Sequence, residues 1–252
     1  MKIVRFVIDN KISYGILEGE SIQGIEGEPY RSIKPSGQKY QLKEVKLLAP
    51  CTPSKIPSVG INYRTSAEEL KIPLRKEPFI FSKPPTAVIG PEENIIYHPD
   101  LTRVDYEGEL AIVIKKQAWQ ISEEEALDYV LGYTCFNDVT ARDLHDRELT
   151  RAKSYNTFAA FGPYIDTEFD PSNFTLETYL NGKLKQQTDN SDLVFGIPKI
   201  VSFISRIMTL LPGDIIPTGS PSGVGPMQPG DTVEIKIEPL ATLRNYVVKS
   251  SE

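Results

Sequence analysis

One run of residues, from Val104 to Ile114, constrains this chain more than any other part of the sequence. It reads VDYEGELAIVI, so two glutamates precede five apolar residues in succession. A continuous apolar run of this length is typical of a strand buried on both faces, and we expect one over residues 108–115. Side chains two apart on a strand share a face, which places Glu107 and Glu109 together where the strand enters the core. Gly108 between them has no side chain and would allow another element to pack closely there.

Two carboxylates held side by side repel each other unless a cation lies between them. A third carboxylate, Asp138, ends the apolar run 131–136 and would reach the same cleft if that run is also a strand. Three carboxylates form an all-oxygen ligand set, which favours Mg²⁺ as the cofactor over Zn²⁺, with Mn²⁺ or Ca²⁺ as competitors. The alternative is that Glu-Gly-Glu is only a solvated strand edge, and the spacing alone leaves that alternative open.

Runs with β-forming composition dominate the remainder of the chain. Asn181-Gly182 is the clearest turn signal and joins strands 174–180 and 183–188 as a hairpin. Further strands are expected at 56–60, 79–82, 131–137, 232–238 and 242–248. Helices are expected at 122–129, 141–149 and 198–210; Ser122 and Glu125 would form a capping box at the first, and Pro198 suits the start of the third. Because there is no β-α-β rhythm, the pattern predicts an α+β domain built on mixed β-sheet.

The N-terminal part of the chain differs from the remainder. Short β-prone runs at 2–8, 13–17 and 21–25 are separated by polar turns and predict a small meander, and a looser stretch with two prolines covers 26–45. We therefore expect a small β-rich N-terminal domain over residues 1–45 and a catalytic domain over residues 46–252.

Composition excludes several classes of protein. The formal net charge of −6 argues against a nucleic-acid partner, since phosphate binding needs a basic surface. No stretch of about 18 apolar residues predicts a membrane span, and the first residues do not resemble a signal peptide. Cys51 and Cys135 form no paired motif, so we expect two reduced, buried thiols in a cytoplasmic protein.

Several segments, in order, resemble the fumarylacetoacetate hydrolase family, and most closely its short bacterial and archaeal members with a small N-terminal domain. They span roughly residues 50 to 248 and are Gly60-Ile61-Asn62-Tyr63, Phe81-Ser82-Lys83-Pro84, Asp105-Tyr106-Glu107-Gly108-Glu109-Leu110, Asn137-Asp138-Val139-Thr140-Ala141-Arg142-Asp143, Ala152-Lys153-Ser154-Tyr155-Asn156-Thr157-Phe158, Gly162-Pro163 and Thr218-Gly219-Ser220-Pro221-Ser222-Gly223-Val224-Gly225. The resemblance implies a compact roll or sandwich of mixed β-sheet, a homodimer and a Mg²⁺-dependent enzyme that acts on small 2-oxo acids without an organic cofactor.

The resemblance also assigns roles to individual residues. It implies that Glu107, Glu109 and Asp138 are the metal ligands and that Lys153 is an active-site lysine. A cation chelated by a 2-oxo acid would stabilise the enolate that forms when a bond to C3 breaks, and Lys153 would add positive charge there. The residues expected to bind or orient the substrate are Asn62, Tyr63, Lys83, Arg142, Tyr155, Thr218 and Gly219.

The sequence departs from the family at the segment after Asn62-Tyr63, which we expect to form a lid over residues 62–77. Hydrolytic members carry a histidine there, with a glutamate three residues later, as a pair that activates water. Here Ser66 occupies the histidine position and Glu69 is retained. A serine of ordinary pKa does not take a proton from water, although Ser66 and Glu69 could equally form a helix capping box. Of the two histidines, we expect His98 to be structural, while His145 could face the site.

Three hypotheses about function are consistent with these residues. We favour a Mg²⁺-dependent enzyme for a small 2-oxo or enol diacid, such as a 2-hydroxyhepta-2,4-diene-1,7-dioate isomerase or a 2-oxo acid decarboxylase of aromatic or sugar-acid catabolism. The first alternative is a C–C bond hydrolase of acylpyruvates that uses Glu69 or His145 in place of the missing histidine. The second is a catalytically silent binding protein. Lys153 and Glu69 are the expected catalytic residues.

Overall fold

The run that the sequence singles out, strand β11 (Gly108–Ile114), lies inside the largest sheet of this computed structural model, which describes residues 1–30 and 32–250. Every residue of β11 is buried. Leu110, Ile112 and Ile114 pack into one apolar core, and Ala111 and Val113 pack into another on the opposite face. Burial on both faces explains why the run is continuously apolar rather than alternating.

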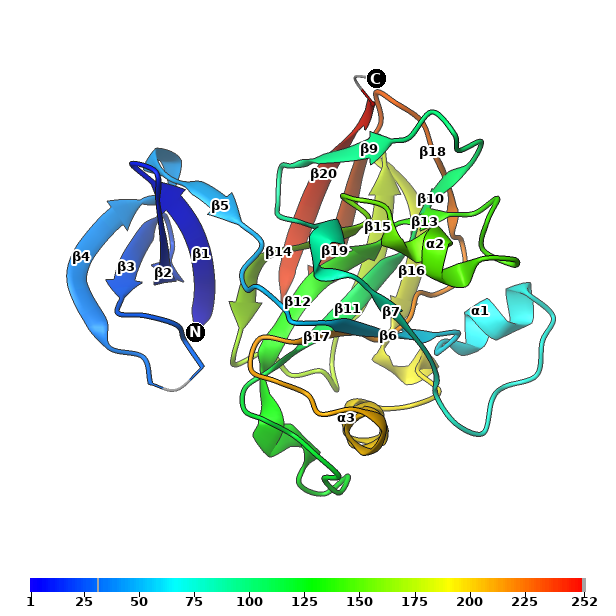
Figure 1. Cartoon of the computed structure of the whole chain (residues 1–252), viewed down its shortest axis with the longest axis horizontal. Coiled ribbons are helices and arrows are strands. Elements are labelled where there is room, and N and C mark those ends of the chain that lie inside the picture. The colour runs from blue at the N-terminus through cyan, green and yellow to red at the C-terminus, as the bar shows by residue number, and fades with distance from the viewer. Residues whose placement is uncertain (31, 251–252) are drawn as a thin grey trace.

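The sheet that contains β11 has ten strands, and Figure 1 shows it running from the main body into the small N-terminal part. In spatial order the strands are β17 (Ile215–Pro217), β11, β12 (Val130–Asp138), β14 (Ala159–Asp166), β1 (Lys2–Ile8), β2 (Lys11–Glu18), β3 (Ser21–Ile25) and β4 (Pro35–Gln41), with β5 (Lys46–Leu48) on β1 and β8 (Val88–Ile89) on β14. The β14–β8 pair is parallel and the others are antiparallel, so the sheet is mixed.

A second sheet of five strands shares the larger core with β11 and β12. Its order is β16 (Lys183–Asp189), β15 (Thr175–Leu180), β19 (Thr232–Glu238), β20 (Ala241–Lys249) and β9 (Asn94–Tyr97). Two smaller sheets complete the roll: β13 (Thr140–Ala141), β10 (Val104–Tyr106) and β18 (Gly225–Met227) form one, and β6 (Ile56–Gly60) and β7 (Phe79–Lys83) form the other. The predicted α+β sandwich of mixed sheet is therefore confirmed.

Most predicted strands are present within one or two residues of the expected bounds. Asn181 and Gly182 adopt positive φ values of 52° and 73° between β15 and β16, the turn that the sequence predicts for this hairpin. The third predicted helix is α3 (Ile197–Ile207). It ends before residue 210 because Met208 is already extended and Leu210 pairs with Ala118.

Two predicted helices are wrong. The segment 122–129 contains the reciprocal Ser122–Glu125 bonds of a capping box, but it forms only turns and a 3₁₀ helix (Ala126–Tyr129), since β12 begins at the next residue. In the segment 141–149, residues 142–147 form turns instead of a helix, because the Asp143 carboxylate accepts bonds from the N–H and hydroxyl of Thr102, each 2.9 Å long. Helix α2 (Leu149–Ser154) begins only after that turn.

The N-terminal strands β1 to β4 carry a small core of their own, formed by Val4, Phe6 and Ile22. The stretch 26–45, expected to be loose, contains β4 and a 3₁₀ helix (Leu42–Glu44). This part joins the main body through the pairs Lys2–Asp166 and Ile3–Ile165 between β1 and β14.

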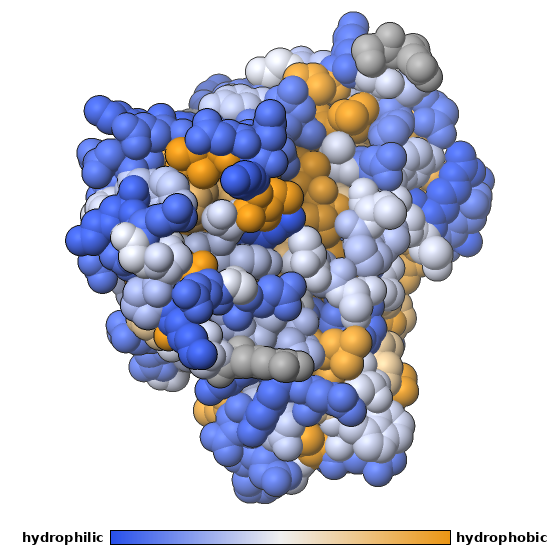
Figure 2. Space-filling model, turned by 60° about the vertical axis from the view of Figure 1, so that its left-hand side comes forward, coloured by the Kyte–Doolittle hydropathy of each residue, from blue (hydrophilic) through white to orange (hydrophobic). Residues whose placement is uncertain are grey.

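The remaining helical elements are α1 (Arg64–Glu69) and the 3₁₀ helices Pro85–Ala87 and Asn190–Asp192. Both cysteines are buried and free, as predicted. Figure 2 shows a face on which hydrophilic residues predominate, with apolar residues in separate patches. Among the described helices, none has the length and apolar character needed to cross a membrane.

Candidate active site

Three strand ends bring the predicted carboxylates together. Glu107 lies at the break between β10 and β11, Glu109 is the second residue of β11, and Asp138 ends β12. Gly108 is paired with Asn137, and the Asp138 N–H donates to the Glu107 carbonyl oxygen at 2.9 Å, which fixes the register of the two strands. One carboxylate oxygen from each residue lies within 4.8 Å of the others, and all three residues are buried. The spacing argument for Glu107 and Glu109 therefore holds in the structure.

This cluster suits a hard divalent cation. Burial, followed by the charges of Asp138 and Glu107, raises the pKa of Glu109 well above its usual value. Glu109 receives only the Gly219 N–H, at 2.7 Å, among the described hydrogen bonds. A cation between the three carboxylates would relieve that repulsion, and their oxygens are ligands that Mg²⁺, Mn²⁺ and Ca²⁺ prefer. The residues present thus fit the predicted metal, although its identity stays a prediction.

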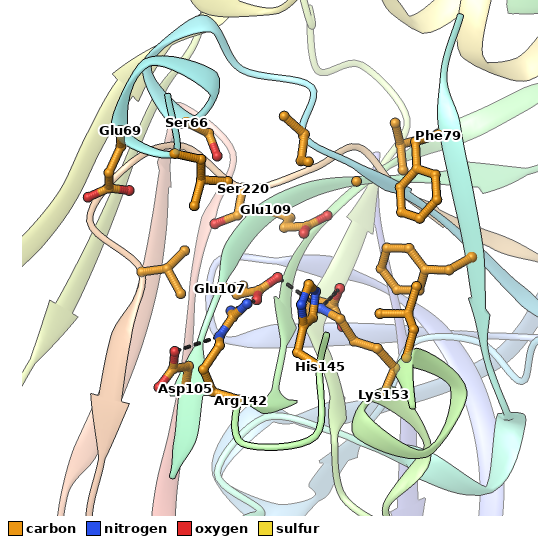
Figure 3. Close-up of a pocket in the computed structure, with 18 of the residues that line it drawn as sticks. Ser66, Glu69, Phe79, Asp105, Glu107, Glu109, Arg142, His145, Lys153 and Ser220 are labelled. Carbon is orange, nitrogen blue, oxygen red and sulfur yellow. Dashed lines mark hydrogen bonds and ion pairs between the residues drawn. The ribbon is translucent and has the colours of Figure 1, made fainter. Parts of the chain in front are cut away.

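Lys153, on α2, reaches two of these carboxylates, and Figure 3 shows Lys153 and Arg142 on either side of His145. Its Nζ donates to Asp138 Oδ2 at 2.7 Å and to Glu107 Oε2 at 2.9 Å, and it also lies 4.8 Å from the centre of the Phe81 ring. Burial would lower the pKa of Lys153, but Asp138 and Glu107 outweigh it and raise the pKa overall. Lys153 is therefore a fixed positive charge beside the candidate cation site.

Lys83 was predicted to bind substrate, but the structure places it behind Asp138 rather than in the lining of the cavity. Its Nζ donates to Asp138 Oδ1 at 2.5 Å and to the Val139 carbonyl oxygen at 3.0 Å. Burial lowers the pKa of Lys83 to about 8 despite the attraction of Asp138. A role in orienting the Asp138 carboxylate fits this position better than contact with a substrate.

Arg142 lines the cavity and is held by two carboxylates. Its guanidinium donates to Asp105 Oδ2 at 2.9 Å and to Glu107 Oε1. Arg103 binds both oxygens of the same Asp105, at 2.8 and 3.0 Å. Asp105 is fully buried and was not predicted as a site residue, although its place two residues before Glu107 could have indicated a shared role.

Asn62 and Tyr63 precede α1 directly and do not line the cavity. The Asn62 amide donates to the carbonyl oxygens of Phe195 (3.1 Å) and Thr218 (2.8 Å) and accepts the Phe195 N–H (2.8 Å). Tyr63 is fully buried just before α1. Both residues therefore anchor the segment that leads into α1.

Thr218 and Gly219 lie directly behind Glu109. The Thr218 hydroxyl donates to the Leu110 carbonyl oxygen at 2.8 Å, and Gly219 adopts a φ of 101° while its N–H binds Glu109. A Cβ on Gly219 would lie 2.9 Å from the Asn62 Cβ, so the close approach requires glycine. The next residue, Ser220, lines the cavity and was not predicted.

Tyr155 was also predicted to bind substrate. Its hydroxyl instead donates to Asp100 at 2.9 Å, its ring packs on His98 and Phe158, and it is absent from the cavity lining. The prediction for Tyr155 thus finds no support in its position.

The segment expected to form a lid is packed at its start and exposed afterwards. Ser66 and Ala67 of α1 are buried, while residues 68–77 are exposed. Ser66 is not a helix cap, because α1 begins after Tyr63, and the Glu69 carboxylate accepts the Gly223 N–H at 3.2 Å. Both Ser66 and Glu69 line the cavity.

The cavity between these residues measures about 290 Å³. Its polar side carries the carboxylate cluster, Arg142 and His145, and its other side is apolar, formed by Val59, Ile61, Leu70, Phe79, Phe81, Leu149 and Val224. Figure 3 shows Phe79 on the wall opposite Asp105 and Arg142. Such a cavity suits a small anionic molecule with an apolar or unsaturated portion.

Comparison with known proteins agrees with the fold and the motifs. Residues 55–248 match the family described as fumarylacetoacetate (FAA) hydrolase C-terminal, and residues 1–50 match the Rv2993c-like N-terminal family. The chain therefore belongs to the fumarylacetoacetate hydrolase family, as the sequence resemblance indicated.

Three relatives illustrate the range of activities in this family. Oxaloacetate tautomerase YisK of Bacillus subtilis is 41% identical over 225 residues, which cover 82% of this chain and 75% of that protein. The crystal structure of a 2-hydroxyhepta-2,4-diene-1,7-dioate isomerase from Mycobacterium marinum is 40% identical, covers 100% of both chains and has a TM-score of 0.93. A maleylpyruvate hydrolase from Sphingobium sp. SYK-6, solved with a manganese(II) ion and pyruvate, is 28% identical, covers 99% of both chains and has a TM-score of 0.83. Isomerase, tautomerase and hydrolase activities thus occur among the named members of this enzyme family.

Proposed function

We propose that this protein is a Mg²⁺-dependent tautomerase or isomerase of a small 2-oxo or enol diacid. One observation carries the proposal: three buried carboxylates and the Lys153 ammonium lie together at a candidate cation site, and Ser66 lines the same cavity. By the family resemblance, Ser66 occupies the position of the histidine that helps to activate water in hydrolytic members. Tautomerisation and isomerisation move a proton between carbon and oxygen, or between two carbons, and need no activated water. The Mycobacterium marinum isomerase and the Bacillus subtilis tautomerase support this assignment.

The chain's own residues would divide the chemistry among them. When bound, a divalent cation supplies Lewis-acid stabilisation of negative charge on the oxygens of a 2-oxo acid. Lys153 holds a positive charge 2.7 and 2.9 Å from two of the carboxylates and favours the enolate electrostatically. Arg142, fixed by Asp105, adds a second positive charge at the polar side. Phe79, Phe81 and Leu149 limit the access of water to the reacting carbon.

The test is a rate measurement on purified protein with Mg²⁺ and the enol form of oxaloacetate, followed by its loss of ultraviolet absorbance. We expect faster conversion to the keto form, loss of that acceleration after removal of divalent cations, and a large loss in Lys153→Met. Lys43→Met, an exposed lysine in the N-terminal part, serves as the matched control. Release of CO₂ without tautomerisation would instead identify a decarboxylase.

Hydrolysis is the second candidate, because Glu69 and His145 line the cavity and the Sphingobium protein is named a hydrolase. Release of a second carboxylic acid from an acylpyruvate would establish it and defeat the main proposal. Binding of oxalate without any turnover, even in Ser66→His, would indicate the silent binding protein.

We further propose a cytoplasmic homodimer that serves small-acid catabolism, a proposal supported by the family resemblance. Light scattering combined with gel filtration tests the dimer.

A further inference from the structure

Proton transfer at carbon needs a group that can accept a proton, and most candidates in the cavity are already committed. Glu107, Glu109 and Asp138 face the candidate cation site. Asp105 accepts two hydrogen bonds from Arg103 and one from Arg142, at 2.8 to 3.0 Å. None of these four carboxylates is free to collect a proton from a substrate.

Three other polar side chains of the lining are Lys153, Ser66 and Glu69. Lys153 is an ammonium that donates to two carboxylates, so it has no lone pair to offer. The Ser66 hydroxyl is not a base at neutral pH. The Glu69 carboxylate accepts the Gly223 N–H at 3.2 Å, and Figure 3 shows it at the edge of the cavity, away from the carboxylate cluster.

His145 differs from these side chains because one of its ring nitrogens can accept a proton. In Figure 3 its ring lies between Arg142 and Lys153, beside Glu107, and it belongs to the lining of the cavity. Its Nδ1 lies 3.0 Å from Asp146 Oδ1. A carboxylate at that distance favours the tautomer with the hydrogen on Nδ1, which leaves a lone pair on Nε2.

The turn that carries His145 is fixed by hydrogen bonds of two of its own residues, Arg142 and Asp143. Arg142 is tied to Asp105 and Glu107, and Asp143 is tied to Thr102. The His145 N–H also donates to the Arg142 carbonyl oxygen at 3.3 Å. These bonds place the imidazole on a fixed support beside the reacting groups, as catalytic bases require.

We propose that His145 is the catalytic base of this enzyme, its Nε2 accepting the proton from C3 of the 2-oxo acid. The C3–H bond breaks, its electron pair forms the C2=C3 double bond, and the carbonyl π electrons move to the oxygen on C2. The proton then passes from Nε2 to that oxygen in a tautomerisation, or to a more distant carbon in the isomerisation of a diene. The proton and electrons balance without water or a redox partner. This inference rests on the proposed function.

The experiment compares wild type with His145→Gln, His145→Ala, Glu69→Gln and His98→Gln, all loaded with Mg²⁺. His98 is the other of the two histidines and lies outside the cavity lining, against Tyr155 and Phe158, so it is the matched control. Each variant is assayed for exchange of the C3 protons of pyruvate in D₂O by NMR, for oxaloacetate tautomerisation, and for oxalate affinity by calorimetry.

We expect His145→Gln to slow both reactions by about 100-fold or more, the usual contribution of a general base, with oxalate affinity changed by less than about threefold, since binding does not require the base. His98→Gln should keep both rates. Added imidazole should restore part of the exchange in His145→Ala, which separates a missing base from a damaged fold.

Four outcomes are decisive. If His145→Gln exchanges the C3 protons at a rate within about threefold of wild type, the proposal is overturned, because removal of a base causes a far larger loss. Exchange that is lost in Glu69→Gln but kept in His145→Gln would overturn it as well. Wild-type exchange of pyruvate that depends on His145, without oxaloacetate tautomerisation, would refute the proposed function and support the base. Wild-type protein that catalyses neither reaction would refute both.

Discussion

Gly108 separates the two glutamates of the candidate metal site, and its replacement by alanine tests how closely the two large sheets pack beneath them. A Cβ at this position would lie 2.2 Å from Thr178 Oγ1, 3.1 Å from Ile235 Cδ1 and 3.3 Å from Gln186 Oε1. Thr178 and Gln186 belong to β15 and β16 of the five-stranded sheet, and Thr178 is fully buried. Atoms at 2.2 Å cannot both stay in place, so either the Thr178 side chain or β11 must move. Because Thr178 is fully buried between the two sheets, we expect β11 to shift as well.

Overpacking a core by one methyl group costs about 1–3 kcal/mol. Crowding on three sides places Gly108→Ala near the upper end, at about 3 kcal/mol, which corresponds to a melting temperature lower by about 6–12 °C in a protein of this size. The shift of β11 also displaces Glu107 and Glu109, and we expect Mg²⁺ affinity to fall about tenfold, roughly 1.4 kcal/mol.

A second substitution makes the test specific. Thr178 Oγ1 has no hydrogen-bond partner among the described residues, so Thr178→Ala removes the crowded atom without breaking a bond. The double variant Gly108→Ala/Thr178→Ala should recover about 2 kcal/mol, a coupling within the range for residues in contact. Gly196→Ala is the control, because its Cβ would meet nothing nearer than 3.9 Å. Urea unfolding and Mg²⁺ calorimetry measure both effects. A loss below about 0.5 kcal/mol in Gly108→Ala, or no recovery in the double variant, would refute the packing argument.

Three further predictions concern the site and its supports. Asp138→Ala should abolish tight Mg²⁺ binding in calorimetry, and unchanged binding would contradict the ligand assignment. Asn62→Ala removes three hydrogen bonds of a buried side chain and should lower the free energy of unfolding in urea by about 2–4 kcal/mol; a loss under about 1 kcal/mol would show that water replaces them. Burial alone would raise the pKa of Glu93, but hydrogen bonds from the Gly90 N–H and the Lys46 ammonium outweigh burial, so the pKa lies below its usual value. The resulting stability is present above the unfolded pKa and is lost as the pH falls through the lowered folded value, so Glu93→Gln should flatten the acid side of a melting-temperature profile, and an unchanged profile would contradict this.

The sequence predicted the centre of the fold better than its connections. The continuous apolar run at β11 and the Asn181-Gly182 turn are local signals, and both were interpreted correctly. Strand β14 was missed, although it lies between β12 and β1, because its run AAFGPYID contains glycine and proline and shows no clear alternation. The expected helix at 141–149 failed because the Asp143–Thr102 contact joins residues 41 positions apart, and no local pattern records such a bond.

The site, like the fold, was predicted where local sequence signals decide the structure and missed where distant residues decide it. Spacing on one strand placed Glu107 and Glu109 together, and the end of an apolar run placed Asp138 beside them. The directions of Lys83 and Tyr155 could not be predicted, since each is set by a distant partner, Asp138 for one and Asp100 for the other. Asp105 and Ser220 were missed because their roles depend on Arg142 and Gln186, which lie 37 and 34 positions away along the chain and reach them only when it is folded.

The pairing of β1 with β14 has a consequence for protein engineering. Beyond β14 the sheet continues into β1, which pairs with β14 at Lys2 and Ile3, and Ile3, Tyr14 and Ile25 share an apolar core with Ile165. A shortened chain that begins near residue 50 would leave Asp166 and Ile165 as an open sheet edge with an uncovered apolar surface, which promotes association between molecules. The N-terminal part therefore covers the edge of the sheet whose strand β12 carries Asp138. Chimeras that exchange this part between relatives should retain these apolar contacts to stay monodisperse.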